Sequence, residues 1–425
     1  MITARAFAGT HYAVLGLARS GLATVEALLA SGGRVTAWDD KEEARAKAPA
    51  GVQLEDFVSG DLARFDSIVV TPGLPLNRHP IAQRAQEAGV EIIGDIELFA
   101  RARPELPPHK VAGITGTNGK STTTALVHHI LKTAGVPAEM GGNIGLPILA
   151  QDPLPEGGVY VLELSSYQID LTQSLDCDVA VLLNITPDHL DRYDDFEAYA
   201  ASKARLFAMQ SPHRLAIVDY RAEADQEVLE EAEDPIIQFI DDVDPGEQVN
   251  WPALQGPHNY QNAAAAVAAC KELGLNQAAV VRGLETYPGL PHRMERVREK
   301  DGVLYVNDSK ATNPTATAPA LAAFPKIRWI CGGQAKTDNL AECAPYFGHV
   351  VKAYTIGEAG EMFASLLSPQ MAVAECVTLD EAVRAAASEA QAGDTVLLSP
   401  ACASFDQFRD FEARGDAFRA LVGEL

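Results

Sequence analysis

The sequence predicts an α/β protein made of three successive α/β domains. Apolar, β-branched segments alternate with amphipathic segments of helical length through the first hundred residues. The same alternation starts again after the proline-rich stretch RARPELPPHK (101–110) and once more after TYPGLPHR (286–293). Strands that alternate with helices are typical of parallel sheets covered by helices. We therefore predict domains at 1–98, 99–289 and 290–425, of which the first and the last are Rossmann-like.

The composition limits the classes of partner. The 425 residues include 34 Lys and Arg against 58 Asp and Glu, a formal net charge of −24. Such a surface repels nucleic acid and anionic lipid, so we expect neither as a partner. The six cysteines form no C-x-x-C pair and lie mostly in apolar or alanine-rich stretches, as buried reduced thiols do. Because there is no signal-like start and no apolar run of the ~20 residues that a membrane span needs, we expect a cytoplasmic protein. We also expect it to be a monomer that acts on small molecules.

The first domain begins with a βαβ unit in HYAVLGLARSGLATVEALLASGGRVTAWDD (11–40). An apolar strand leads into the glycine turn GLARSG (16–21), an amphipathic helix follows, and a second strand ends at Asp39. This pattern nearly matches a dinucleotide-binding fingerprint, although Ala18 replaces its second glycine. On these residues alone, a nicotinamide-dependent oxidoreductase is one interpretation. DSIVVTPGLP (66–75) then supplies a strand that leaves through a Pro-Gly turn.

The second domain contains a strand, a glycine loop and a helix in immediate succession. KVAGIT is predicted to be the strand, GTNG (116–119) the loop, and KSTTTALVHHILKTAG (120–135) the helix. Such a junction directs successive N–H groups and the positive end of the helix dipole at one point. Lys120 adds a charge for the β- and γ-phosphates of a nucleotide, and the Ser121 hydroxyl can reach Mg²⁺. The flanking strand and helix favour this phosphate site, in a central P-loop ATPase-like domain, over a plain turn with a capping serine.

Three further side chains of this domain could serve the same site. Glu163 lies near the end of the strand VYVLELS, and His189 follows the strand VAVLLNIT. A carboxylate at the carboxyl edge of a parallel sheet points into the crevice where ligands bind, although a lone Glu or His there is often only a cap or a surface residue. Lys203 shares the apolar face of its helix with Phe196 and Phe207. Its ammonium must therefore either extend to water or lose its charge.

The loop TGTNGKS (115–121) resembles the nucleotide loop of the Mur ligase family, the ATP-dependent peptide-forming enzymes of bacterial cell-wall precursor synthesis. The resemblance implies a phosphate-proximal role for Asn143 of GGNIG, two Mg²⁺ sites, and a CO₂-derived carbamate on Lys203. The metal ligands it implies are Ser121, Glu163, His189 and Lys203. The ATP-binding residues it implies are Gly116, Thr117, Asn118, Gly119, Lys120, Ser121, Thr122, Asn259, Asn262, Arg293 and Asp308. The catalytic residues it implies are Lys120, Lys203, His189, Asn143 and Lys310.

Two motifs of the third domain resemble the branch of this family that adds D-glutamate. They are VNDSKATNPTA (306–316) and SPACASFDQFRDFEARG (399–415), and CGGQAKTDN (331–339) agrees with them. The D-glutamate-binding residues that the resemblance implies are Lys310, Thr312, Lys336, Ser404, Phe405 and Phe411. Taken without the resemblance, a lysine in a glycine-rich turn and a serine after a strand are ordinary turn chemistry.

The resemblance also assigns a function to the first domain and to the whole chain. It implies that the first domain binds the uridine diphosphate end of a substrate, through Arg19, Ser20, Asp39, Asp40, Thr71, Pro72, Gly73 and, from the central domain, Asn143. The pair Asp40-Lys41 departs from the family pattern. The implied reaction adds D-glutamate to UDP-N-acetylmuramoyl-L-alanine through an acyl phosphate, with ATP and Mg²⁺. A sister Mur ligase, a folylpolyglutamate synthase-like amide ligase and a non-catalytic nucleotide binder are the alternatives.

Overall fold

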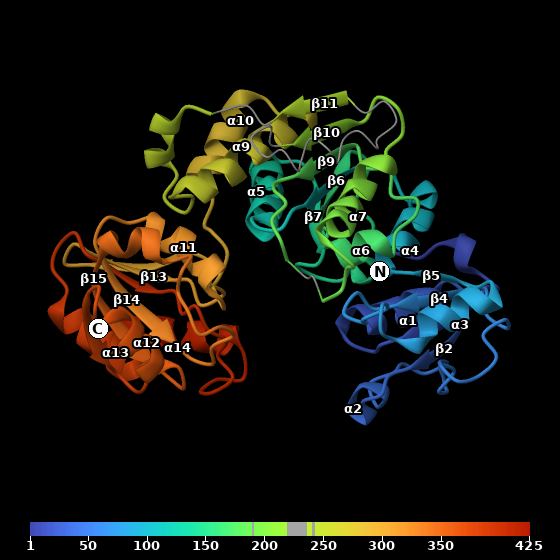
Figure 1. Cartoon of the computed structure of the whole chain (residues 1–425). Helices are drawn as coiled ribbons and strands as arrows, with labels where there is room; N and C mark the ends of the chain where they lie inside the picture. Colours follow the sequence, from blue (N-terminus) through green and yellow to red (C-terminus); the bar gives the residue numbers. More distant parts are fainter. Residues whose placement is uncertain (189–190, 219–235, 240–242) are drawn as a thin grey trace. The chain divides into compact units, whose positions relative to one another are not determined.

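The computed structural model describes residues 1–188, 191–218, 236–239 and 243–425 (Figure 1). These residues form three sheets with helices packed around them, which confirms the predicted α/β class. The chain divides into two compact units, each described here by itself. The first unit comprises 1–243 and 262–283, and the second comprises 244–261 and 284–425.

The first sheet is parallel and has the order β3-β2-β1-β4-β5. Its strands are β1 (His11–Leu15), β2 (Arg34–Trp38), β3 (Gln53–Leu54), β4 (Ser67–Val70) and β5 (Glu91–Ile93). The helices between and after them are α1 (Arg19–Ala30), α2 (Glu42–Arg45), α3 (Pro80–Ala88) and α4 (Asp95–Ala102). Because β1 lies between β2 and β4, the turn after β1 is at the point where the strand order reverses, which is where such sheets bind ligands.

The second sheet is also parallel, with the order β11-β10-β9-β6-β8-β7. Its strands are β6 (His109–Thr115), β7 (Ala138–Gly142), β8 (Gly158–Glu163), β9 (Val179–Leu182), β10 (Leu215–Val218) and β11 (Ile236–Phe239). The helices of this region are α5 (Lys120–Thr133), α6 (Ser166–Asp170), α7 (Phe196–Ala208), α9 (Pro257–Glu272) and α10 (Gln277–Thr286). The core is continuous with that of the first sheet, since the ring of Phe99 on α4 packs edge-on against Tyr160 of β8 at 5.0 Å between centroids.

The third sheet is mixed, with the order β12-β13-β17-β14-β15-β16 and an antiparallel edge strand β12. Its strands are β12 (Glu295–Lys300), β13 (Val303–Asn307), β14 (Ile327–Gly332), β15 (Val350–Ile356), β16 (Ala372–Glu375) and β17 (Thr395–Leu398). Its helices are α11 (Pro314–Ala322), α12 (Gly360–Leu367), α13 (Leu379–Glu389) and α14 (Phe411–Glu424). Trp329 of β14 packs in one core with α11 and α12, and its neighbour Ile330 packs in the other with α13 and α14. Helices therefore cover both faces.

Every strand predicted from the sequence is present, including the edge strand β5, whereas the edge strands β7 and β12 were not predicted. β7 has the sequence AEMGG and β12 the sequence ERVREK, so neither carries an apolar run, because an edge strand is only half enclosed. All six cysteines are buried, as predicted. Among the described residues, none of the helices combines the length and the apolarity that crossing a bilayer requires. The domain boundaries at 98 and 289 stay predictions.

Candidate active site

The carboxyl ends of neighbouring strands bring most of the central candidate residues together. β6 lies between β8 and β9, and β7 flanks β8. The glycine loop follows β6, Glu163 is the last residue of β8, and Asn143 comes directly after β7. Since parallel strands end at the same edge of a sheet, these groups share one crevice. His189 follows β9 and lies outside the described residues.

The glycine loop has a backbone that only glycine tolerates at two positions. Gly116 and Gly119 have φ values of 147° and 87°. A Cβ on Gly119 would lie 2.2 Å from Oδ1 of Asn262, so a larger residue would have to displace that side chain in addition to adopting a left-handed φ. The loop is also held by Asn184, whose Oδ1 accepts a hydrogen bond of 2.9 Å from the Asn118 amide. Asn184 was not among the predicted site residues, although its place just after the neighbouring strand β9 was a usable signal.

Lys120 is the first residue of α5, and its side chain folds back over the loop. Its Nζ donates hydrogen bonds of 2.7 and 2.8 Å to the carbonyl oxygens of Gly116 and Thr117. The ammonium, the loop amides and the first turn of α5 therefore converge, and each of them favours an anion. This geometry fits the phosphates of a nucleotide.

Glu163 is a buried carboxylate with one oxygen still to be satisfied. The residue is 2% exposed, and its Oε1 accepts a 2.9 Å hydrogen bond from Nδ2 of Asn143. Among the described residues no group donates to its Oε2. Leaving a buried charged oxygen without a partner is costly, so this site fits a cation such as Mg²⁺, with the hydroxyl-bearing Ser121 in the adjacent first turn of α5. The described residues contain no cluster of three His, Cys, Asp or Glu side chains arranged for a metal.

Lys203 is buried, as its place on the apolar face of α7 predicts. It is 1% exposed, its Nζ donates a 3.2 Å hydrogen bond to the carbonyl of Gly116, and the ammonium lies 4.7 Å from the ring centroid of Tyr199. Burial, and then the positive charge of Lys120, lower the pKa of Lys203 to about 7. The carbonyl of Gly116 thus accepts from both lysines, and Lys203 is neutral for much of the time near neutral pH.

The N-terminal candidates lie in the first turn of α1 and on the loops that follow β2 and β4. Asp39 stabilises the glycine turn, because its Oδ2 accepts a 2.7 Å hydrogen bond from the amide of Leu17. Arg19 reaches the central domain, where its guanidinium donates a 2.8 Å hydrogen bond to the carbonyl of Gly145. Arg192 ties the loop after β4 to the same domain by donating to the carbonyl of Leu74. Ser20, Thr71 and Pro72 are half-buried, and Asp40 and Gly73 are exposed.

The C-terminal candidates follow β13, β14 and β17, which are adjacent strands in the order β13-β17-β14. Nζ of Lys310 lies 3.9 Å from the ring centroid of Phe411, which brings two predicted D-glutamate-binding residues together. Ser404 is buried, Thr312 is half-buried, and Lys336 and Phe405 are exposed, Phe405 to 67%. The loops that carry these residues follow the carboxyl ends of parallel strands, so they lie at one edge of the sheet.

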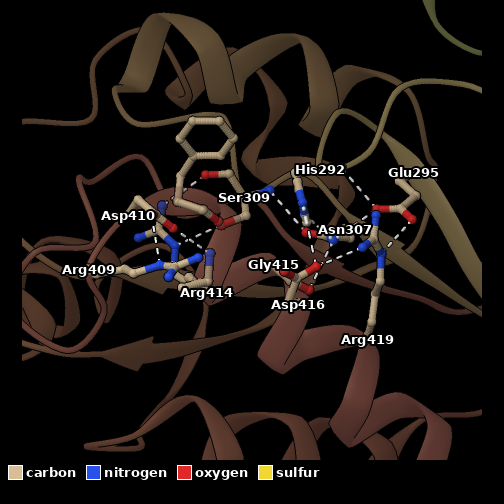
Figure 2. Close-up of polar contacts among 12 residues, drawn as sticks. His292, Glu295, Asn307, Ser309, Arg409, Asp410, Arg414, Gly415, Asp416 and Arg419 are labelled. Carbon is tan, nitrogen blue, oxygen red and sulfur yellow. Dashed lines mark hydrogen bonds and ion pairs between the residues drawn. The ribbon is translucent and has the colours of Figure 1, made fainter. Parts of the chain in front are cut away.

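Asp308 and His292 support the loop that carries Lys310. Oδ2 of Asp308 accepts a 2.7 Å hydrogen bond from the Ser399 hydroxyl, and burial raises the pKa of Asp308 to about 7. The His292 carbonyl accepts a 3.0 Å hydrogen bond from the amide of Lys310. Figure 2 shows His292 beside Asn307, whose Nδ2 lies 3.1 Å from its Nδ1. Asn262 belongs to the first unit, while Asn259, Arg293 and the D-glutamate-side residues belong to the second.

Comparison with known proteins matches all three α/β regions of the chain to one family. Residues 10–94 match the Mur ligase MurD-like N-terminal domain, 114–242 the Mur ligase middle domain, and 292–402 the Mur ligase glutamate ligase domain. The chain belongs to the Mur ligase family, and membership implies the use of ATP and Mg²⁺.

Within that family, several curated relatives that match the whole of this chain are named UDP-N-acetylmuramoylalanine–D-glutamate ligase. The protein of that name from Novosphingobium aromaticivorans is 63% identical over all of this chain and 97% of its own length. The one from Zymomonas mobilis is 54% identical over the full length of both chains.

Solved structures agree in fold. A UDP-N-acetylmuramate–alanine ligase from Thermotoga maritima superposes with a TM-score of 0.60 at 16% identity, covering 98% of this chain and 99% of its own. A MurF ligase from the same organism, in complex with ADP, also has a TM-score of 0.60, at 15% identity over 99% and 97% of the two chains.

Proposed function

We propose that this chain is an ATP-dependent ligase that adds D-glutamate to UDP-N-acetylmuramoyl-L-alanine in peptidoglycan precursor synthesis. The observation that carries the proposal is the glycine loop, where Lys120 lies over two loop carbonyls close to the buried, half-satisfied carboxylate of Glu163. The full-length relatives of that name support the choice of substrates.

The reaction needs an activated carboxylate, because a free carboxylate has no good leaving group for an attacking amine. Transfer of the γ-phosphoryl group of ATP to the L-alanine carboxylate forms an acyl phosphate and ADP. The D-glutamate amine then attacks the acyl carbon, the amide bond forms, and phosphate leaves. Two anions must meet in the first step, and the Lys120 ammonium and the loop amides lower that repulsion.

Two features of the central site serve the metal, whose charge would neutralise the phosphates. Glu163 and Ser121 would hold Mg²⁺, with Asn143 orienting the Glu163 carboxylate. His189 completes the proposed ligand set. We further propose that neutral Lys203 reacts with CO₂ to form a carbamate, which turns a buried amine into an anion suited to supporting a second Mg²⁺. The pKa of about 7 keeps the amine available for that reaction.

The third domain supplies the proposed D-glutamate site. Lys310, Lys336 and Ser404 would hold the two carboxylates of the amino acid and place its amine for attack. Phe411 fixes the Lys310 ammonium through the 3.9 Å ring contact. We also propose that the chain works as a monomer in the cytoplasm, where its sugar-nucleotide substrate is soluble. A gel-filtration mass of twice the 45.3 kDa chain would contradict the monomer.

The test is phosphate release by the purified protein with ATP, Mg²⁺ and UDP-N-acetylmuramoyl-L-alanine. D-Glutamate should support release, whereas L-glutamate, L-alanine and L-lysine should not. A preference for L-alanine or L-lysine would point to a sister ligase, and binding without release would point to a nucleotide binder.

Replacing Lys120 distinguishes phosphate release by this protein from release by a contaminating enzyme. Lys120→Ala should lower phosphate release by at least about 100-fold, since it removes the only side-chain charge aimed at the loop from α5 itself. Lys132→Ala is the matched control, because Lys132 is exposed in the last turn of the same helix. Equal activity of the two variants would remove the basis for the phosphate site.

A further inference from the structure

Arg414 is a buried arginine to which neither the sequence analysis nor the proposed mechanism gives a role. It lies in the first turns of α14 and is 1% exposed, one of the largest fully buried side chains of the protein. Its Nε donates a 2.9 Å hydrogen bond to the hydroxyl of Ser309. One terminal nitrogen donates to the carbonyls of Ser309 and Cys402 at 2.9 and 3.0 Å, and the other to the carbonyl of Ala403 at 3.2 Å. Figure 2 shows the guanidinium turned toward Ser309.

These contacts join the loops that carry the proposed D-glutamate-binding residues. Ser309 immediately precedes Lys310 on the loop after β13, and its hydroxyl also donates a 2.8 Å hydrogen bond to the carbonyl of Phe411. Cys402 and Ala403 immediately precede Ser404 on the loop after β17. A single rigid guanidinium therefore fixes the spacing between two loops that are about ninety residues apart in the sequence.

The third loop, which follows β14 and carries Lys336, is held through its contact with Ala403. The amide of Gln334 donates a 2.9 Å hydrogen bond to Ala403, and the Ala403 amide returns one of 2.9 Å. Gly333 just before it leaves no room for a side chain, since a Cβ there would lie 2.4 Å from the Ala403 oxygen and 3.2 Å from the Arg414 guanidinium. The loop that leads to Lys336 thus closes against Arg414 as well.

The charge of Arg414 is not cancelled by the groups that it contacts. The acceptors of its four hydrogen bonds are three carbonyls and one hydroxyl, all uncharged. Burial lowers the pKa of Arg414 to about 10, so the guanidinium stays protonated at neutral pH. The carboxylate of Asp406 attracts the guanidinium and raises its pKa, but none of the described carboxylates accepts a hydrogen bond from it. A buried cation held only by neutral acceptors is costly, and it raises the positive potential at the adjacent sheet edge.

We propose that Arg414 is a positioning and specificity-determining residue for the amino-acid substrate: it fixes the positions of the three loops relative to one another, and its charge, which no hydrogen-bonded carboxylate offsets, favours the doubly carboxylated D-glutamate. Arginine suits this place because its five donors form a rigid planar fork, whereas lysine offers a single flexible ammonium. The inference rests on the proposed function, since it takes the three loops as the D-glutamate site.

Steady-state kinetics of three variants test this role. Arg414→Met should raise the KM for D-glutamate by roughly 10- to 100-fold, as expected for losing hydrogen bonds made by a charged group, while the KM values for ATP and for the sugar nucleotide change little. Arg414→Lys keeps the charge without the fork and should give an intermediate KM. Arg384→Met is the control, because Arg384 is an exposed arginine of the same unit, paired with Asp380 on α13.

A smaller change covers the case in which Arg414→Met does not fold, and a rescue experiment adds a readout that a merely structural role would not move. Ser309→Ala removes one acceptor and the link to Phe411, and it should raise the same KM by a few-fold with little loss of stability. Added methylguanidinium should lower the KM of Arg414→Ala toward that of the unmodified protein.

An unchanged KM for D-glutamate in folded Arg414→Met, or equal increases of all three KM values, would overturn the inference. Absence of D-glutamate-dependent phosphate release in the unmodified protein would instead overturn the proposed function. The two failures are therefore distinguishable.

Discussion

Nδ2 of Asn143 donates a hydrogen bond of 2.9 Å to Oε1 of Glu163, and this contact aims the second oxygen of a buried carboxylate away from protein donors. The Asn143 amide also donates 2.9 Å to the Glu163 carbonyl, so the two residues are joined twice. An asparagine that fixes the orientation of a metal-binding carboxylate acts on the metal affinity.

Asn143→Ala should therefore raise the Mg²⁺ concentration that gives half-maximal activity. Outer partners of metal ligands are worth about 10- to 100-fold in metal affinity, and an effect in that range is expected here. The measurement is phosphate release against Mg²⁺ concentration at saturating ATP. Asn276→Ala is the control, because Asn276 only caps the start of α10, where its side chain accepts from the amide of Ala279. A reduced maximal rate with an unchanged Mg²⁺ dependence would contradict the orienting role.

The carbamate on Lys203 should be visible directly. Protein equilibrated with ¹³C-labelled CO₂ should show a carbamate carbon resonance that is absent in Lys203→Arg and present in Lys132→Arg. Because burial lowers the pKa of Lys203 to about 7, the neutral amine grows as the pH rises from 6 to 8, and the resonance should grow with it at constant dissolved CO₂. Retention of the signal in Lys203→Arg would assign it to another amine.

Asp308 should make the second unit less stable as the pH rises. Burial raises the pKa of Asp308 from 3.8 to about 7, so between these values the folded chain holds a proton that the unfolded chain has released. Stability contributed by this group is complete below pH 3.8, falls as the pH rises toward 7 and stays low above it. Between pH 5 and 8 the loss should be about 3 kcal/mol, and Asp308→Asn should abolish it.

Urea unfolding measures this effect, because two of the three tryptophans, Trp251 and Trp329, are buried in the second unit and report on it by fluorescence. The difference in midpoint between pH 5 and pH 8 is compared in the two proteins. An equal pH dependence in Asp308→Asn would assign the titration to other groups.

Two glycines of α14 should respond in opposite ways to the same substitution. A Cβ on Gly415 would lie 2.1 Å from Nδ1 of His292, which Asn307 and Glu295 hold in place. Gly415→Ala should therefore cost about 1–3 kcal/mol through overpacking. A Cβ on Gly423 meets nothing within 4 Å, so Gly423→Ala should leave stability unchanged or raise it by up to about 1 kcal/mol. The measurement is the thermal unfolding temperature of Gly415→Ala and of Gly423→Ala. Similar shifts in both variants would show that the His292 ring moves aside at little cost.

The parts of the fold that were predicted from the sequence are those that depend on residues close together in the chain. β1, β6 and β17 are apolar and β-branched because both faces of their sheets are covered, and Gly16 and Gly119 mark the turns that follow two of them. The burial of Lys203 was predictable because its spacing to Phe207 is helical. Each of these patterns is contained in one short segment of the sequence.

The contacts that hold the site rigid were not predictable in the same way. Asn184 meets Asn118 across 66 positions, and Arg414 meets Ser309 across 105, so no local window contains both partners. An arginine on an acidic, mostly helical C-terminal segment is ordinarily a surface residue. Its burial follows only from the packing of α14 against three loops. Asp39 was assigned to the uridine diphosphate end of the substrate, an assignment that stays a prediction, while the hydrogen bond that it accepts from the Leu17 amide shows a role in the turn.

The burial of all six cysteines has a practical consequence. Raised pKa values, to about 12 for Cys177, Cys343 and Cys402, keep those sulfurs protonated as well as covered. The unmodified chain should therefore react little with maleimide dyes. One new cysteine introduced on the surface of each compact unit would accept a donor and an acceptor dye, and energy transfer between them would report in solution how the spacing of the two units changes as nucleotide binds.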